Sequence, residues 1–310
     1  MYAGSKAIFY ALSRSAVLKR LASRHGLATP TSFASRFIAG ETIETAIEAS
    51  SRLQSQGLLV TLDYLGERVR TLEESTAAAV GYVRLLEAMV AAGIDRNISL
   101  KLTQLGIDID HATCVDNLRR ILEPASRQDC FVRIDMENSP YTERTLTIFE
   151  TLWEQNYRNV GVALQASLHR TEDDIRRMNK LGARVRLVKG AYKEPSATAY
   201  KEKKVVNATF LRLARLLLDE GHYPAIATHD PELIDAVCAY ATEQNLAQDQ
   251  FEFQLLYGIR RDLQASLVAA GFRVRVYVPF GREWFPYFMR RLGERPANVA
   301  FVLKSLLAER

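Results

Sequence analysis

The chain has 310 residues, 48% of them hydrophobic, so it can bury a large core, and a barrel of this length can form one domain. A formal net charge of +5 favours anionic small molecules or an anionic membrane surface as partners. It is too small an excess for a typical nucleic-acid-binding protein. Three scattered cysteines without a CxxC pair indicate buried thiols in a reducing, cytoplasmic compartment and no metal site, and no apolar run is long enough to span a membrane.

Residues 1–55 form a predicted N-terminal helical segment. Residues 1–40 contain six Lys or Arg and no acidic residue, which is compatible with a mitochondrial transit peptide or with an amphipathic helix at the inner face of a bacterial membrane. We favour a basic helical layer that belongs to the fold, because residues 42–54 continue in helical period without a visible cleavage site.

Residues 56–310 repeat one theme, a short β-rich run followed by a longer helical stretch. The candidate strands are 59–64, 98–105, 131–136, 160–165, 184–189, 225–229, 251–256 and 273–278. Eight such units predict an α/β fold of the parallel (βα)8 barrel type with additional N-terminal helices. A doubly wound open sheet is the alternative, but it would more often carry a glycine-rich fingerprint after the first strand, and none is present.

Strand alternation turns a set of polar residues toward the barrel interior. The inward set comprises Lys101, Arg133, Asp135, Gln165, Arg186, Gln254, Arg275 and Tyr277, together with Val188 and Leu256. Arg133 with Asp135, or Lys101 with Asp135, could instead form a buried ion pair that only holds the barrel mouth together. As a group they are expected at the C-terminal strand ends, where barrel enzymes place their chemistry, and their excess of cations over Asp135 predicts an anionic ligand.

A charged stripe follows the last strand. Tyr287, Arg290, Arg291 and Glu294 are spaced i, i+3, i+4 and i+7, so a helix would present all four on one face. Paired guanidinium groups suit capture of a carboxylate, whereas the simpler interpretation is a solvated face with i,i+4 pairs.

Several motifs, in order along the chain, resemble proline dehydrogenases of the short monofunctional bacterial type. They are Arg-Ile-Asp-Met-Glu at 133–137, Arg-Leu-Val-Lys-Gly-Ala-Tyr at 186–192, Ala-Thr-His-Asp at 227–230, Gln-Leu-Leu-Tyr-Gly at 254–258 and the stripe at 287–294. The resemblance runs from about residue 37 to 307 and implies a distorted barrel whose final helix lies over a flavin. It also implies oxidation of L-proline to Δ1-pyrroline-5-carboxylate by hydride transfer to FAD, with electrons passed on to a membrane quinone.

The resemblance also implies roles for individual residues. Arg290, Arg291 and Lys101 would hold the proline carboxylate, while Tyr277, Tyr287 and Leu256 would pack around the ring. A tyrosine at position 287 favours proline over 4-hydroxyproline as the substrate. Asp135 would orient Lys101, Arg186 would stabilise the reduced flavin, and Glu67 and Glu294 would be gate residues, with Glu67 pairing with Arg290. The residues expected to contact the cofactor are Met136, Gln165, Arg186, Val188, Lys189, Gly190, Ala191, Thr228 and His229.

Three competing functions remain open at this point. A flavin barrel similar to methylenetetrahydrofolate reductase would share the fold and cofactor, but it does not explain the stripe at 287–294. A Schiff-base aldolase could use Lys101 or Lys189 as its amine, although alternation turns Lys189 outward and Lys101 neighbours a carboxylate. A basic barrel bound peripherally to a membrane would need no chemistry at its mouth.

Overall fold

The computed structural model describes residue 32 and residues 34–294, except for the side chains of residues 293 and 294. The strands are β1 (Leu59–Tyr64), β2 (Asn97–Leu100), β3 (Phe131–Ile134), β4 (Val160–Gln165), β5 (Arg184–Val188), β6 (Ala225–Ala227), β7 (Glu252–Leu256) and β8 (Val274–Phe280). The helices are α3 (Ile43–Gln54), α4 (Leu72–Ala91), α5 (His111–Arg127), the short η1 (Ser139–Tyr141), α6 (Thr142–Glu154), α7 (Thr171–Leu181), α8 (Lys203–Glu220), α9 (Pro231–Glu243), α10 (Arg261–Ala269) and α11 (Trp284–Glu294).

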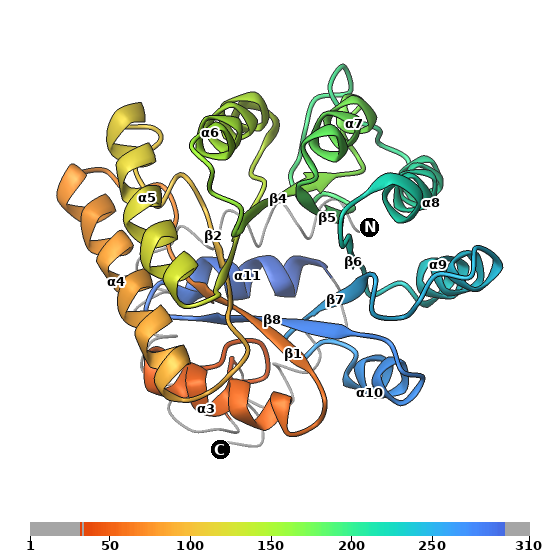
Figure 1. Cartoon of the computed structure of the whole chain (residues 1–310), viewed down its shortest axis with the longest axis horizontal. Coiled ribbons are helices and arrows are strands. Elements are labelled where there is room, and N and C mark those ends of the chain that lie inside the picture. Colours follow the sequence, from red (N-terminus) through yellow and green to blue (C-terminus); the bar gives the residue numbers. More distant parts are fainter. Residues whose placement is uncertain (1–31, 33, 295–310) are drawn as a thin grey trace.

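The eight strands close into one parallel barrel in sequence order, with β8 paired to β1. The helices α4 to α10 follow their strands and surround the barrel (Figure 1). Strands of this kind bury both faces, which explains why β4 and β2 consist entirely of buried residues. The prediction of a (βα)8 barrel is therefore confirmed.

Two helices depart from a regular eightfold ring. The described part of the predicted N-terminal segment includes α3, which contacts β1, β8 and α4 and so covers the outer seam where the barrel closes. The last helix, α11, packs instead against Leu65 after β1 and Ile259 after β7, and partly against Leu256 and Tyr277 (Figure 1). Because these residues lie at C-terminal strand ends, α11 lies over the mouth of the barrel.

Residues 34–41 hold α11 in place. Phe37 packs against Phe288 with ring centroids 6.1 Å apart, and Trp284 Nε1 donates to the Glu41 carboxylate at 2.8 Å. Backbone bonds from Ala39 N–H to the Pro279 carbonyl fix the same segment to the end of β8. The rest of the predicted N-terminal segment, residues 1–31 and 33, lies outside the described residues.

Several strands end earlier than the sequence indicated. The strand expected to reach residue 105 ends at Leu100, because residues 101–105 fold back in turns with Gln104 N–H bonded to the Lys101 carbonyl. Likewise β6 ends at Ala227, where the Thr228 hydroxyl accepts the Asp230 N–H at 3.2 Å and α9 begins. Alternation is a rule for paired strands, so it does not place residues beyond these ends.

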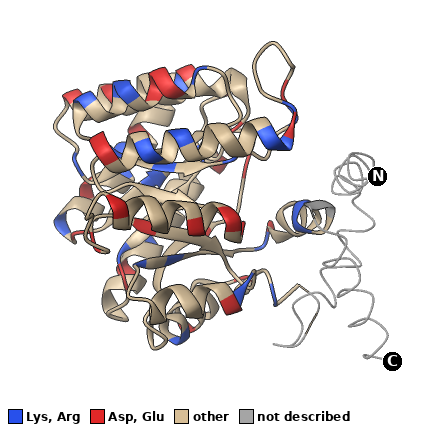
Figure 2. Cartoon of the chain, turned by 90° about the vertical axis from the view of Figure 1, so that its right-hand side faces the viewer, with Lys and Arg blue, Asp and Glu red and all other residues tan. Residues whose placement is uncertain are grey.

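The outer helices carry basic and acidic residues side by side (Figure 2). Arg177 pairs with Glu150 and Glu143, and Arg212 pairs with Glu172, which joins α6, α7 and α8. Exposed pairs of this kind contribute little each. Among the described helices, none is both long and apolar enough to cross a membrane.

Candidate active site

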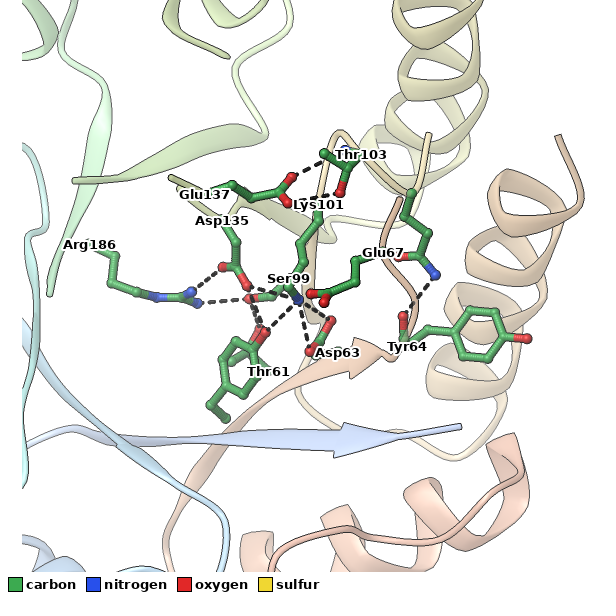
Figure 3. Close-up of polar contacts among 12 residues, drawn as sticks. Thr61, Asp63, Tyr64, Glu67, Ser99, Lys101, Thr103, Asp135, Glu137 and Arg186 are labelled. Carbon is green, nitrogen blue, oxygen red and sulfur yellow. Dashed lines mark hydrogen bonds and ion pairs between the residues drawn. The ribbon is translucent and has the colours of Figure 1, made fainter. Parts of the chain in front are cut away.

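Lys101 is the centre of the polar network at the barrel mouth. Its ammonium lies 3.2 Å from Asp63 at the end of β1 and 3.6 Å from Asp135 just beyond β3 (Figure 3). The Lys101 residue is only 8% exposed and Asp63 is fully buried. One cation therefore serves two carboxylates in a largely dry environment, where such pairs interact strongly.

Asp135 links two further side chains to this lysine. It accepts one hydrogen bond from the Arg186 guanidinium at 2.6 Å and another from the Tyr277 hydroxyl at 2.6 Å. Arg186 also donates to the Ser99 hydroxyl at 2.8 Å, and its guanidinium lies 5.3 Å from the centre of the Tyr277 ring. Asp135 therefore contacts both cations that it was predicted to orient. We call Asp63, Lys101, Asp135, Arg186 and Tyr277 the mouth network.

The protonation states follow from the shared cation. Burial alone would lower the pKa of Lys101, but the carboxylates of Asp63 and Asp135 outweigh it and raise that pKa above its usual value. Burial raises the pKa of Asp63, and repulsion from Asp135 adds to it, against the attraction of Lys101. The pKa values of Lys101 and Asp63 are both raised, because one ammonium is shared by two carboxylates that repel each other. A lysine kept charged in this way is a poor Schiff-base nucleophile.

Glu137 ties the loops after β2 and β3 together. Its carboxylate accepts from the Thr103 N–H at 3.2 Å and the Thr103 hydroxyl at 2.8 Å (Figure 3). The Glu137 carbonyl accepts from the Gln165 side chain at 2.8 Å. Gln165 thus faces the mouth from the end of β4, held through its amide nitrogen. Met136, between Asp135 and Glu137, is buried in the main core.

The helix α11 brings the predicted stripe to the same mouth. Arg290 NH1 lies 2.9 Å from the Glu67 carboxylate, so the pair expected from the sequence is present. Burial would raise the pKa of Glu67, but Arg290 and Lys101 outweigh it and hold that pKa below its ordinary value. The Arg291 guanidinium lies 5.1 Å from the centre of the buried Tyr287 ring. The side chain of Glu294 lies outside the described residues.

The ends of β5 and β6 carry several residues that were predicted to contact a cofactor. Lys189 pairs with Asp230 at 2.9 Å, across the two strand ends. Gly190 has φ +110°, and a Cβ there would come 2.2 Å from the Ser167 hydroxyl oxygen, so only glycine fits this turn. Val188 is half-buried, and Gly190 and Ala191 are exposed, which leaves this backbone accessible at the mouth.

These residues fit an anionic flavin cofactor. The buried Arg186 Nε has no hydrogen-bond partner among the described residues, so a cationic donor remains unsatisfied at the mouth. A buried donor without a partner is costly, and an acceptor atom of a bound ligand would satisfy it. The accessible backbone at Gly190 and the Lys189 ammonium provide further donors at the C-terminal ends of β5 and β6.

Three residues predicted at the mouth lie elsewhere, and one of them, Gln254, donates its side-chain amide to the Glu252 carboxylate. Arg275 pairs with Glu252 at 2.8 Å and with Asp95, and these groups stand at the starts of β8, β7 and β2. Arg133 NH1 donates to the carbonyls of Val162 at 3.0 Å and Arg184 at 2.5 Å, and no pair with Asp135 forms. We call Asp95, Arg133, Glu252 and Arg275 the floor cluster. The expected excess of cations at the mouth was therefore wrong.

Gly161 explains why Arg133 lies toward the floor. A Cβ at Gly161 would come 2.9 Å from Arg133 NH1 and 2.4 Å from the Arg184 carbonyl. The missing side chain on β4 leaves the space that the guanidinium occupies. Strand alternation predicts whether a side chain points into the barrel, but it does not predict whether a long side chain then extends toward the mouth or the floor. That direction depends on the space left by neighbouring residues such as Gly161.

The sequence interpretation also missed Asp63, Ser99, Thr103 and Glu137. A signal for Asp63 existed, since Val60 and Leu62 alternate with Thr61 and Asp63 in β1, which turns the polar pair inward. Thr61 indeed contacts Ser99 across the barrel interior at 3.0 Å. Thr103 and Glu137 lie beyond the strand ends, so no alternation rule could have paired them.

Comparisons with known proteins agree with this arrangement. The family model "Proline dehydrogenase" matches residues 46–304. Proline dehydrogenase 1 of Bacillus subtilis (strain 168) is 41% identical over 300 residues, covering 97% of this chain and 98% of the relative. The proline dehydrogenase of Deinococcus radiodurans is 42% identical over 278 residues, covering 88% and 90% respectively.

A solved structure agrees as well. Proline utilization A (PutA) from Bdellovibrio bacteriovorus, inactivated by N-propargylglycine, superposes with a TM-score of 0.78 at 26% identity and covers 84% of this chain. The chain corresponds to 32% of that larger protein. The near-complete matches to the shorter relatives carry the conclusion: this chain belongs to the proline dehydrogenase family, whose members are flavin-dependent enzymes acting on proline.

Proposed function

We propose that this protein oxidises L-proline to Δ1-pyrroline-5-carboxylate, with FAD as the hydride acceptor and a membrane quinone as the final acceptor of the electrons. Family membership supports the reaction class. The observation that carries the proposal is the convergence of α11 on the mouth network, which brings Arg290 and Arg291 above Lys101 and Tyr277.

Substrate binding is assigned to the cations of the mouth. Arg290 and Arg291 would hold the proline carboxylate from α11, with Lys101 as a third positive contact, because guanidinium groups bind carboxylates bidentately. Leu256, Tyr277 and Tyr287 would form the wall around the pyrrolidine ring. Leu256 and Tyr277 pack against the apolar cluster that contains Tyr287, which supports this grouping.

Asp135 acts by orientation. It holds Arg186 and Tyr277 at 2.6 Å each and attracts Lys101, so three groups of the site depend on one carboxylate. Fixed geometry of this kind places a reacting carbon without further reorganisation. The substrate nitrogen must be unprotonated before its carbon releases hydride, and the charged Lys101 is not suited to take that proton.

FAD would supply the two-electron acceptor. Arg186 would lie against its ring system and stabilise negative charge, and Gln165 would donate or accept at its polar edge. The remaining contacts are assigned to Met136, Val188, Lys189, Gly190, Ala191, Thr228 and His229.

Glu67 would act as a gate. Its carboxylate pairs with Arg290, the group assigned to the substrate carboxylate. Entry of proline would exchange one carboxylate partner for another, a loop-scale step. The role of Glu294 as a second gate residue stays a prediction from the sequence.

An anaerobic visible spectrum tests the function. The purified protein should show an oxidised flavin spectrum that bleaches with L-proline but not with D-proline or NADH, and a quinone should restore it. Bleaching by NADH and not by L-proline would replace the proposal with a reductase. Absence of flavin after FAD is added would contradict the cofactor, and borohydride trapping of a carbonyl substrate would then identify an aldolase.

A further inference from the structure

The strand β6 ends before its neighbour β7 does. In β7, Glu252 N–H donates to the Pro224 carbonyl on the β6 side at 3.1 Å, whereas Tyr257 N–H donates to Tyr277 of β8 at 3.0 Å. Successive N–H groups of a strand in a parallel sheet point to opposite neighbours, so every second one points to the same neighbour. Leu256 N–H therefore points to the β6 side, beyond the last residue of β6, Ala227.

A histidine side chain takes the place of the missing backbone partner. Leu256 N–H donates to His229 Nε2 at 2.8 Å. The chain has already turned away at this point, since Thr228 accepts from Asp230 N–H and α9 starts at Pro231. The imidazole thus extends the β6–β7 ladder by one rung after the backbone of β6 has left the sheet.

This contact fixes the chemistry of the ring. A backbone N–H can only donate, so the nitrogen that receives it must carry a lone pair. His229 is therefore neutral, with its proton on Nδ1. His169 provides the opposite case, because its Nε2 lies 3.1 Å from the Ser196 carbonyl and must carry a proton to bond there.

The same turn also connects to β5. Asp230 holds Lys189 at 2.9 Å, so residues 228–230 link the C-terminal ends of β5, β6 and β7. Lys189 belongs to the proposed cofactor contacts and Leu256 to the proposed wall of the substrate pocket. His229 links this turn to Leu256 through its side chain.

We propose that His229, as the neutral Nδ1–H tautomer, is a positioning residue for Leu256 and thereby sets the width of the pocket that receives the substrate ring. The substrate consequence rests on the proposed function, whereas the tautomer and the hydrogen bond do not. The hydrogen bond to Leu256 uses only Nε2, so this role adds to the cofactor contact proposed for the rest of the His229 ring.

Imidazole NMR tests the tautomer directly. In protein labelled with 15N-histidine, the chain's five histidines can be assigned by single substitutions. We expect a protonated Nδ1 and an unprotonated Nε2 for His229, and a protonated Nε2 for His169 as the internal control. A protonated Nε2 at His229, or exchange between both tautomers, would overturn the proposal.

Two variants test the positioning role. His229→Gln places Oε1 as many bonds from Cβ as Nε2 and keeps an acceptor, whereas His229→Leu leaves the Leu256 N–H without one. We expect the Leu256 amide to exchange about 10-fold faster in His229→Leu and near the wild-type rate in His229→Gln. Equal exchange in all three proteins would contradict the tie.

The pocket is tested on protein saturated with FAD, with FAD affinity measured separately. We expect His229→Leu to raise KM for L-proline about 10-fold, to weaken its discrimination against the six-membered ring of L-pipecolate, and to be rescued by His229→Gln. Unchanged discrimination would overturn the pocket role. If L-proline never reduces the flavin, the proposed function fails, while amide exchange still decides whether His229 holds Leu256.

Discussion

The two ends of this barrel both bury charged side chains, but they satisfy them differently. In the floor cluster, Arg275 is enclosed by Glu252, Asp95 and the Val60 carbonyl. In the mouth network, Lys101 is shared by Asp63 and Asp135. In the floor cluster the charge of Arg275 is balanced by acidic groups of the same cluster. At the mouth, the charged groups share their partners or, like Arg290, pair with a residue of a loop.

The pKa values of two buried acids express this difference. Burial would raise the pKa of Glu252, yet Arg275 outweighs it, so the pKa lies below its ordinary value. The pKa of Asp63 is raised, because burial and Asp135 exceed the attraction of Lys101. Two buried carboxylates that share one cation and repel each other are typical of functional sites, whereas a carboxylate paired with its own cation is typical of structural ion pairs.

The largest expected effect is on stability, at the floor. Glu252→Gln removes the charge that compensates buried Arg275, so the free energy of unfolding should fall by about 3–5 kcal/mol in denaturant titrations. The exposed control Glu172→Gln should cost less than about 1 kcal/mol. In the folded fraction of Glu252→Gln, KM for L-proline should stay within about twofold. A tenfold rise in KM would contradict the division between floor and mouth.

Glu252 also gives a pH dependence with a defined sign. Its folded-state pKa is depressed, so its stabilising contribution is present above the pKa of the unfolded chain and is lost as pH falls through the folded value. The acid limb of the unfolding free energy should therefore be shallower in Glu252→Gln than in the wild type. An identical acid limb would show that Glu252 is not held ionised by its neighbours.

The next effect is on catalysis, at the mouth. Asp135→Asn keeps the shape but removes the charge that holds Arg186 and Lys101, so kcat/KM for L-proline should fall about 100-fold. Its cost in stability should be only about 1 kcal/mol, because loss of this charge relieves Asp63. A stability loss as large as that of Glu252→Gln would make Asp135 a structural residue instead.

A similar loss is expected at the carboxylate clamp. Arg291→Ala should raise KM for L-proline about 100-fold and leave bound flavin unchanged, since one charge-assisted pair to the substrate is lost. Arg291→Lys keeps the charge but not the planar fork and should recover only part of the affinity. Equal KM values for Arg291→Ala and the wild type would remove Arg291 from the clamp.

The smallest effect is expected at the gate. Glu67→Gln weakens a partly exposed pair with Arg290, so stopped-flow measurements should show proline entering and leaving about fivefold faster. The pKa of Glu67 is depressed, so the pair persists as pH falls through the ordinary carboxyl range. If Glu67→Ala left substrate affinity and turnover unchanged, the gate would be wrong.

The sequence predicted the fold well because parallel barrels repeat one unit. Period-two alternation also turned Arg186 of β5 toward the interior, where it meets Asp135, and Lys101 and Asp135 still face inward although each lies one residue beyond the end of its strand. It failed for Arg133 and Arg275, because a long side chain can bend toward either end of the barrel. Gly161 decided that direction for Arg133, and the effect of an absent side chain on a neighbouring strand is invisible to periodicity.

Contacts made beyond the strand ends were the second limit. The pairing of Thr103 with Glu137 joins two loops whose paths depend on the whole barrel. The Glu67–Arg290 pair was anticipated only through family resemblance, because its members lie 223 residues apart in the chain. The hydrogen bond between His229 and Leu256 could likewise be predicted only if the last residue of β6 were known, and residue propensities do not define where a strand ends.

The division between a closed floor and a shared mouth is tested most directly by anaerobic stopped-flow reduction of the bound flavin. L-Proline should reduce the flavin of Glu252→Gln at nearly the wild-type rate and that of Asp135→Asn about 100-fold more slowly. Equal slowing in both variants would contradict the account, because the two clusters would then act as one.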